Sequence, residues 1–257
     1  MHIEEILYTQ GFGTRRVCAG LVQQGFVTID GAPVTDPGAD VATDGLRFTV
    51  QGTAWAYHEK AYLMLHKPAG TECSQKPSTY PSIYTLLPSP LRLRPNKGAV
   101  QGVQAIGRLD QDTTGLLLLT DDGTLLHRWT SPRHHVPKVY DVSCKHPVTD
   151  DQIARLLGGV VLLDDPQPVK ALAAEPWHGA AEGLHGLRLT LAEGKYHQVK
   201  RMLAAVGNRV EALHRSRIGQ LALPDDLAPG QWRWLDADQV EGLRSARGGQ
   251  PTVGVAR

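Results

Sequence analysis

The most informative part of this 257-residue chain runs Gly107-Arg108-Leu109-Asp110-Gln111-Asp112-Thr113-Thr114-Gly115-Leu116-Leu117-Leu118-Leu119-Thr120-Asp121-Asp122-Gly123. Four consecutive leucines, bounded by Gly115 and by an Asp-Asp-Gly turn, predict a short strand that is buried on both faces. Glycines at both ends let the backbone turn sharply and let another molecule approach closely. The stretch therefore predicts an acidic side chain at the edge of a rigid sheet, facing a cleft.

The composition is that of an ordinary globular protein, with 41% apolar and 21% charged residues. No apolar run approaches the roughly 18 residues that a membrane span needs. The first residues, Met1-His2-Ile3-Glu4-Glu5, lack the features of a signal peptide. Three widely spaced cysteines, an odd number, indicate reduced thiols. We therefore expect a cytoplasmic protein without membrane association. The cysteines are Cys18, Cys73 and Cys144.

Charge is distributed unevenly along the chain, although the net charge is only +1. Residues 188–218 contain seven Lys or Arg and two acids, whereas residues 1–52 contain three basic residues and six acids. A local positive patch on a neutral protein suits attraction to a phosphate backbone. The same count also fits a solvated face that acids from elsewhere in the fold balance.

Apolar spacing and turn signals divide the chain into four parts. We expect a small N-terminal domain over residues 1–52, a linker over 53–59, a core over 60–240 and a disordered tail over 241–257. Residues 91–103, with Arg92, Arg94 and Lys97, predict a basic, glycine-containing loop suited to mobility or RNA contact. Helices are expected at 3–10, 14–24, 80–87, 124–129, 150–158 and 196–205, and strands at 26–34, 46–50, 138–144, 186–191, 209–218 and 220–223.

Three further segments, together with the opening stretch, resemble the motifs of the pseudouridine synthases that act on bacterial ribosomal RNA. They are Tyr62-Leu63-Met64-Leu65-His66-Lys67-Pro68-Ala69-Gly70, Thr130-Ser131-Pro132-Arg133-His134-His135 with Lys138-Val139-Tyr140, and Glu193-Gly194-Lys195-Tyr196-His197-Gln198-Val199-Lys200-Arg201-Met202. The residue patterns Ser-Pro-Arg-His-His and Tyr-His-Gln-Val-Lys-Arg-Met resemble those of the enzyme for small-subunit (16S) ribosomal RNA more than those of its large-subunit relatives. Residues 1–52 resemble the alpha-L RNA-binding domain.

This resemblance implies an α+β fold. We expect a mixed, largely antiparallel sheet with surrounding helices and a central cleft, plus the small alpha-L domain. It implies isomerisation of uridine to pseudouridine in small-subunit ribosomal RNA by a monomer that needs no cofactor. The RNA would be bound either free or in a small-subunit assembly intermediate.

The resemblance also implies roles for individual residues. Asp110 would be the catalytic acid, Lys200 its ion partner and Tyr140 the platform for the flipped base. Arg108 would fill the space that this base leaves. The residues by themselves do not separate Asp110 from Asp112, and either could be an ordinary turn or capping carboxylate. Further RNA contacts are expected from Lys67, Arg133, His134, Arg201, Arg15 and Arg16.

Other readings of the same residues remain open. The chain could modify large-subunit ribosomal RNA, or bind RNA as a non-catalytic ribosome-assembly factor. A hydrolase that uses Asp110 and Asp112 as paired carboxylates would need them roughly 5–10 Å apart on opposite sides of the bond. His134-His135 with His127 lacks the Cys or Glu that would complete a tetrahedral zinc set, so we expect no metal site.

Overall fold

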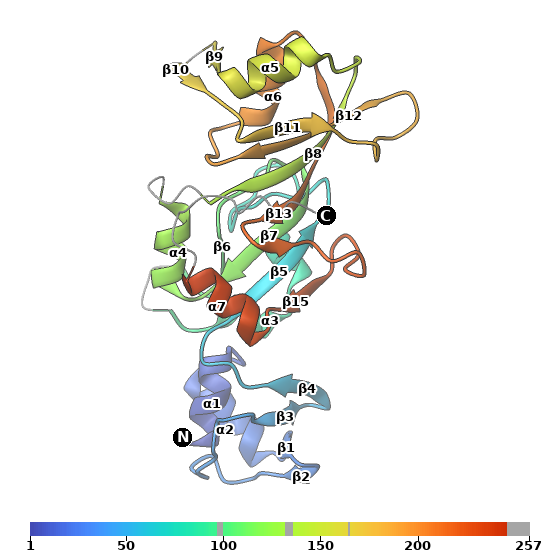
Figure 1. Cartoon of the computed structure of the whole chain (residues 1–257). Coiled ribbons are helices and arrows are strands. Elements are labelled where there is room, and N and C mark those ends of the chain that lie inside the picture. The colour runs from blue at the N-terminus through green and yellow to red at the C-terminus, as the bar shows by residue number, and fades with distance from the viewer. Residues whose placement is uncertain (97–99, 132–135, 164, 246–257) are drawn as a thin grey trace, which may run out of the picture.

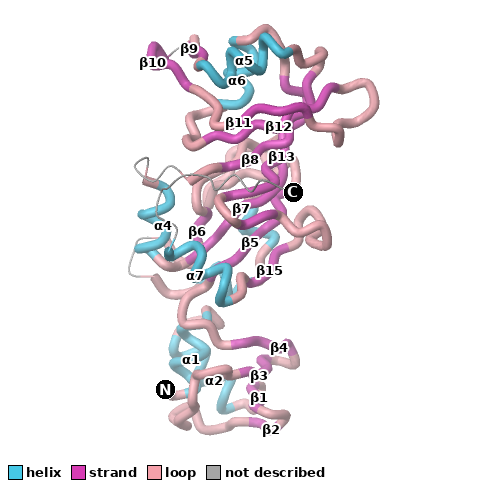
Figure 2. Tube along the Cα trace, viewed as in Figure 1, coloured by secondary structure: helices cyan, strands magenta, loops and turns pink. Residues whose placement is uncertain are grey.

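The computed structural model describes the whole chain except residues 97–99, 132–135, 164 and 246–257. Figure 1 shows an elongated molecule with a small N-terminal domain at one end and a long sheet through the middle. Strands form most of the centre, and helices lie toward the periphery (Figure 2). Among the described residues, none of the helices has the length and apolar character to cross a membrane.

Two helices and a four-stranded sheet form the N-terminal domain. They are α1 (Ile3–Gln10), α2 (Arg15–Gln23), β1 (Val27–Ile29), β2 (Ala32–Pro33), β3 (Arg47–Val50) and β4 (Thr53–Ala56), with the strand order β2-β1-β3-β4. Thr14 begins α2 because its hydroxyl accepts the N–H of Val17. The helices and the first three strands match the prediction. The predicted linker over 53–59 is wrong at its start, because β4 pairs with β3.

A nine-stranded mixed sheet forms the core of the described chain. Its order is β11 (Ala173–Pro176), β12 (His185–Leu191), β8 (Lys138–Cys144), β13 (Val210–Ile218), β7 (Thr114–Thr120), β5 (Tyr62–Lys67) and β15 (Trp232–Trp234), with β14 (Leu221–Ala222) beside β13 and β6 (Gln104–Ala105) beside β7. Only the β13–β7 pair is parallel in this sheet. The predicted α+β class with a largely antiparallel sheet is confirmed.

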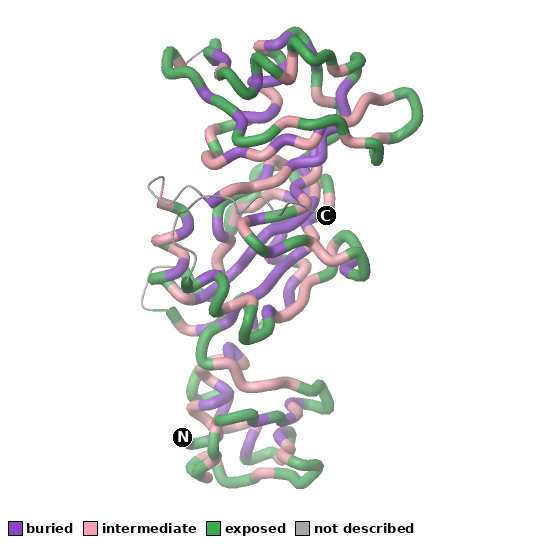
Figure 3. The backbone as a smooth tube through the Cα atoms, viewed as in Figure 1, coloured by how far each residue is buried: buried purple, intermediate pink, exposed green. Residues whose placement is uncertain are grey.

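The four leucines of β7 are buried from both sides, as predicted. Their exposed fractions are 0–1%, and alternate side chains belong to different core clusters. Figure 3 colours the central strands of the sheet mainly as buried. Gly115 lets β7 lie against β13, because a Cβ there would sit 2.3 Å from the carbonyl oxygen of Arg215. This close pairing aligns Gly115 with Arg215, which is in turn paired with Tyr140 on β8.

Helices and one hairpin complete the structure. They are η1 (Ile83–Leu86), α3 (Ser89–Leu93), α4 (Gly123–Thr130), α5 (Asp150–Gly158), α6 (Gln198–Ala205), α7 (Ala237–Ser245) and the pair β9 (Val160–Leu162) and β10 (Asp165–Val169). The predicted tail begins too early, because α7 runs to Ser245. Leu243 on this helix is 2% exposed, and its carbonyl accepts the indole N–H of Trp129 at 3.0 Å. The remaining predicted tail, 246–257, lies outside the described residues.

Arg94 joins the two domains and is 1% exposed, so this residue of the predicted basic loop is neither mobile nor open to RNA. Its Nε lies 2.6 Å from Oδ2 of Asp121, at the end of β7. Its Nη1 donates to Oε1 of Gln10 on α1 at 3.0 Å, and its Nη2 donates to the carbonyl of His58 at 2.7 Å. The ring of His58 stacks on Trp234 at 3.7 Å. The junction is therefore a packed and hydrogen-bonded contact.

Candidate active site

The loop that carries Asp110 is fixed to the sheet by Leu109 and by Lys67. Leu109 anchors it in a core cluster, and the Asp110 side chain beside it keeps 27% of its surface exposed. Lys67, at the end of β5, donates from Nζ to the carbonyls of Gln111 at 3.2 Å and Thr113 at 2.9 Å. The buried strand pair thus presents one partly exposed carboxylate at its edge.

Lys67 does not fit the RNA-contact role predicted for it, because its side chain is fully buried. A third carbonyl, that of Pro68, also accepts from its ammonium at 3.1 Å. Burial lowers the pKa of Lys67, although the carboxylates of Asp112 and Asp110 act in the opposite direction. Lys67 therefore holds the aspartate loop rather than facing solvent.

Lys200, on α6, lies between the two carboxylates of the loop. Its Nζ is 2.8 Å from both carboxylate oxygens of Asp112 and 3.5 Å from Oδ2 of Asp110. The structure thus brings Lys200 to Asp110 as predicted, but with shorter bonds to Asp112. Partial burial acts to raise the pKa of Asp112, yet the hydrogen bonds and charge of Lys200 outweigh it and leave that pKa below its ordinary value.

His197 is a site residue to which sequence reasoning gave no role. Its Nε2 lies 3.5 Å from Oδ1 of Asp110, on the other oxygen from Lys200. His197 precedes α6 with φ 49° and ψ 32°, a left-handed conformation that is uncommon for a residue other than glycine. The only available signal was its place within the Tyr-His-Gln-Val-Lys motif. Asp110 thus has a basic side chain beside each of its oxygens.

Two cavities meet at Asp110. The inner one, of about 70 Å³, also touches Tyr140 on β8, a residue that is 8% exposed. The outer one, of about 520 Å³, also touches Tyr196 and Asp112. The residues that line both cavities are Arg108, Leu109, Asp110, His197 and Lys200. Three motifs therefore converge on one place in the fold, the first through Arg108 and Asp110, the second through Tyr140 and the third through Lys200.

The other residues predicted to contact RNA differ in how far they are exposed, and two of them lie outside the described residues. Arg15 and Arg16 are exposed at the start of α2, and the guanidinium of Arg15 lies 4.6 Å from the ring centre of Tyr8. Arg201 is partly exposed on α6, where its Nη1 donates to the carbonyl of Tyr196 at 2.9 Å. Arg133 and His134 lie outside the described residues.

Much of the basic excess over residues 188–218 is neutralised by acids from other elements. Arg188 pairs with Asp141 at 2.6 Å, and Lys195 pairs with Asp165. Arg215 is 2% exposed and cannot contribute a surface charge. The alternative of a balanced face therefore applies to a large part of this segment.

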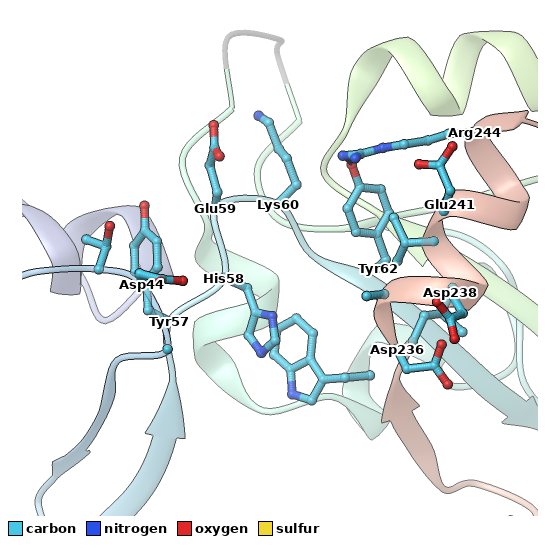
Figure 4. Close-up of a pocket in the computed structure, with 16 residues that line it drawn as sticks. Asp44, Tyr57, His58, Glu59, Lys60, Tyr62, Asp236, Asp238, Glu241 and Arg244 are labelled. Atoms are coloured by element: carbon cyan, nitrogen blue, oxygen red, sulfur yellow. Dashed lines mark hydrogen bonds between the residues drawn. The ribbon is translucent and has the colours of Figure 1, made fainter.

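A larger cavity than these two, about 960 Å³, lies at the junction of the two domains and not at Asp110. Figure 4 shows its carboxylates, including Asp44, Glu59 and Asp236, together with Lys60 and Arg244. Acids outnumber bases in this lining, which opposes binding of a phosphate backbone. Within the described residues, no three His, Cys, Asp or Glu side chains gather closely enough to hold a metal ion.

Comparison with known proteins identifies the family of each domain. The model of the RNA pseudouridylate synthase family matches residues 61–205, and that of the S4 domain matches residues 3–44. Ribosomal small subunit pseudouridine synthase A of Escherichia coli (strain K12) is 41% identical over 238 residues, which span 90% of this chain and 95% of that protein.

The protein of the same name from Yersinia pestis is 39% identical over 249 residues, spanning 93% of this chain and 97% of its own length. A crystal structure of a pseudouridylate synthase, 34% identical, covers 95% of this chain and 99% of its own with a TM-score of 0.62. The chain therefore belongs to the RNA pseudouridylate synthase family and carries an N-terminal S4 domain.

Proposed function

We propose that this enzyme converts one uridine of small-subunit (16S) ribosomal RNA into pseudouridine, with Asp110 as the catalytic residue. Two relatives named for the ribosomal small subunit, at 39% and 41% identity over almost their whole length, support this choice of RNA. The reaction breaks the bond between C1' of the ribose and N1 of uracil, rotates the base and rejoins it through C5. No atom is gained or lost overall.

The observation that carries the proposal is the setting of the Asp110 carboxylate. It stands at the wall between two cavities, 3.5 Å from the ammonium of Lys200 and 3.5 Å from the imidazole of His197. A carboxylate in this position can attack C1' as a nucleophile or remove a proton from C2' as a base. The Lys200 ammonium supplies a counter-charge once bound RNA excludes water.

Asp110 suits this role better than Asp112. Both oxygens of Asp112 accept from Lys200 at 2.8 Å, and its side chain is 51% exposed. Asp110 is more enclosed, at 27%, and lines the cavity that contains Tyr140. In the proposal, Asp112 orients Lys200, and Asp110 acts on the sugar.

The remaining side chains would receive the extruded nucleotide. The aromatic ring of Tyr140 would stack on the flipped uracil, and the exposed guanidinium of Arg108 would fill the space that the base leaves. Arg15, Arg16 and Arg201 would contact phosphates. The proposed substrate is free RNA or a small-subunit assembly intermediate, and the enzyme would bind it as a monomer. The modification would take place in the cytoplasm.

Pseudouridine mapping in 16S and 23S ribosomal RNA from cells with and without the gene tests the proposal. One 16S position should lose its modification, and wild-type protein should restore it in the purified RNA or in isolated subunit precursors. Asp110→Asn should lower the rate by about 100-fold or more. Asp112→Asn, the matched control, should lower it by about tenfold or less, since it removes a half-exposed ion pair. A lost 23S position, or equal rates for wild type and Asp110→Asn, would contradict the proposal.

A further inference from the structure

Tyr196 is the most exposed aromatic side chain among the described residues, at 71%, although it belongs to the wall of the active site. Its ring is stacked on that of His197, with centroids 3.8 Å apart and planes inclined by 21°. The imidazole of His197 in turn reaches the carboxylate of Asp110 at 3.5 Å. A series of contacts therefore leads from the catalytic carboxylate to an open aromatic face.

The position of Tyr196 is set by its neighbours before any RNA arrives. His197 adopts a left-handed backbone conformation, and such conformations persist only where surrounding contacts impose them. Two contacts supply this constraint here. The Oε1 of buried Gln198 accepts the N–H of Lys195 at 2.8 Å, and Nη1 of Arg201 donates to the Tyr196 carbonyl at 2.9 Å. A preset ring loses little freedom when it binds a ligand.

The two cavities at Asp110 differ in the aromatic residue that each contains. Tyr140 lines only the inner cavity, whereas Tyr196 lines only the larger outer one. Given the proposed function, the target uracil enters beside Tyr140. Its extrusion separates the neighbouring base in the strand from one of its stacking partners. An exposed aromatic ring is the usual replacement for a lost stacking partner in RNA recognition.

We infer that Tyr196 forms a second subsite, which stacks on the nucleobase adjacent to the target uridine. The contact would consist of stacking on the aromatic face of the ring and would not require hydrogen bonds from a carboxylate or amide group. Stacking of this kind tolerates every base. The subsite would therefore increase affinity for an unpaired strand and leave sequence selection to other contacts.

A fluorescent base analogue tests this inference without turnover. A short single-stranded RNA would carry one uridine with 2-aminopurine on its 5' or its 3' side, and the full-length Asp110→Asn protein would be the parent. Binding should quench the fluorescence on one of the two sides. Adding Tyr196→Leu should abolish that quenching and weaken binding by roughly 5- to 150-fold. Adding Tyr196→Trp should preserve both, and Leu157→Ala, at a residue that is 40% exposed on α5, should change neither.

An abasic nucleotide at the quenched position separates stacking from general damage to the site. It should weaken binding to the parent as much as Tyr196→Leu does, and the variant should lose nothing further on this RNA. Two results would overturn the inference. One is unchanged quenching in the Tyr196→Leu variant. The other is a loss of affinity, for this variant on the abasic RNA, that equals the product of the two separate losses. Because binding is measured with an inactive protein, absence of pseudouridine formation by wild type would count against the proposed function alone.

Discussion

Replacing Arg94 with methionine would remove the side chain that joins the S4 domain to the catalytic domain. Arg94 is buried together with Asp121, whose side chain is 5% exposed. After the substitution, the Asp121 carboxylate would still accept the N–H of Ala61 at 2.7 Å. The contact from Arg94 to Gln10 on α1 would also be lost. The variant therefore affects both the charge balance of the junction and the attachment of the N-terminal domain.

The expected destabilisation is large because one partner of a buried ion pair is left behind. Such changes cost about 3–5 kcal/mol, against a total stability of about 5–15 kcal/mol for a typical domain. Adding Asp121→Asn should recover at least half of that loss. The amide keeps an oxygen for the Ala61 N–H and removes the unpaired charge. The coupling between the two positions should therefore be about 2 kcal/mol or more.

Urea unfolding followed by tryptophan fluorescence measures these changes, because Trp55 and Trp234 lie at the junction with ring centroids 6.0 Å apart. Circular dichroism on the same samples would show whether the two domains unfold together. Arg92→Met is the matched control on α3, since Arg92 is exposed, and it should stay within about 0.5 kcal/mol of wild type. A loss below about 1 kcal/mol for Arg94→Met, or additive single and double variants, would refute the argument.

Three further predictions concern backbone approach, loop support and pH. Gly11→Ala should loosen the domain junction more than Gly25→Ala destabilises its own turn. Both residues have positive φ (89° and 70°). Of the two, only Gly11 would bring its new Cβ against a backbone atom, the carbonyl oxygen of Pro90 at 2.0 Å. Thermal unfolding of the two variants measures the difference in stability. Lys67→Met should reduce pseudouridine formation while the slope of log Kd against log salt concentration stays unchanged; a slope smaller by about one would mean that Lys67 binds a phosphate after all. Lys138→Met should be more stable than wild type at pH 7. Burial, with the charge of Arg215, lowers the pKa of Lys138 from 10.5 to about 8 in the folded protein. Between about pH 8 and 10.5 the unfolded chain therefore binds more protons at this lysine than the folded protein does. The free energy of unfolding of wild type thus rises with pH across that range. The advantage of Lys138→Met in urea titrations should therefore shrink across that range, and a constant advantage would contradict the assignment.

Local sequence signals predicted the elements that bury continuous apolar runs or end in clear caps. The strand Thr114–Thr120 has four leucines between two glycines, and the helix Asp150–Gly158 begins with a capping box in which Thr149 and Gln152 bond reciprocally. Two strands without a buried residue escaped prediction. The strand Thr53–Ala56 has no buried residue, and Ala173–Pro176 has none either, so neither shows the alternation of a half-buried strand.

The motifs located the candidate site because Asp110, Tyr140 and Lys200, which come from three of them, line one cavity. They could not give the pairing within it. Lys200 lies 2.8 Å from Asp112 and 3.5 Å from Asp110, and residues that are 88 and 90 positions away along the sequence give no signal of this difference. His197 was missed for a related reason, since a left-handed residue before a helix has no sequence signal unless it is glycine or asparagine.

The two basic residues that were misjudged show what counting charges along a sequence leaves out. Lys67 and Arg94 stand in segments rich in glycine and proline, where a cation is usually solvated and available to RNA. Both are buried, and each finds one or more of its acceptors in a segment that flanks β7. Lys67 bonds to the carbonyls that precede the strand, and Arg94 bonds to Asp121, which follows it. The two cations thus hold opposite ends of the strand that follows Asp110, so in the proposed mechanism they would support the geometry of the site, and exposed residues such as Arg15 would bind phosphate.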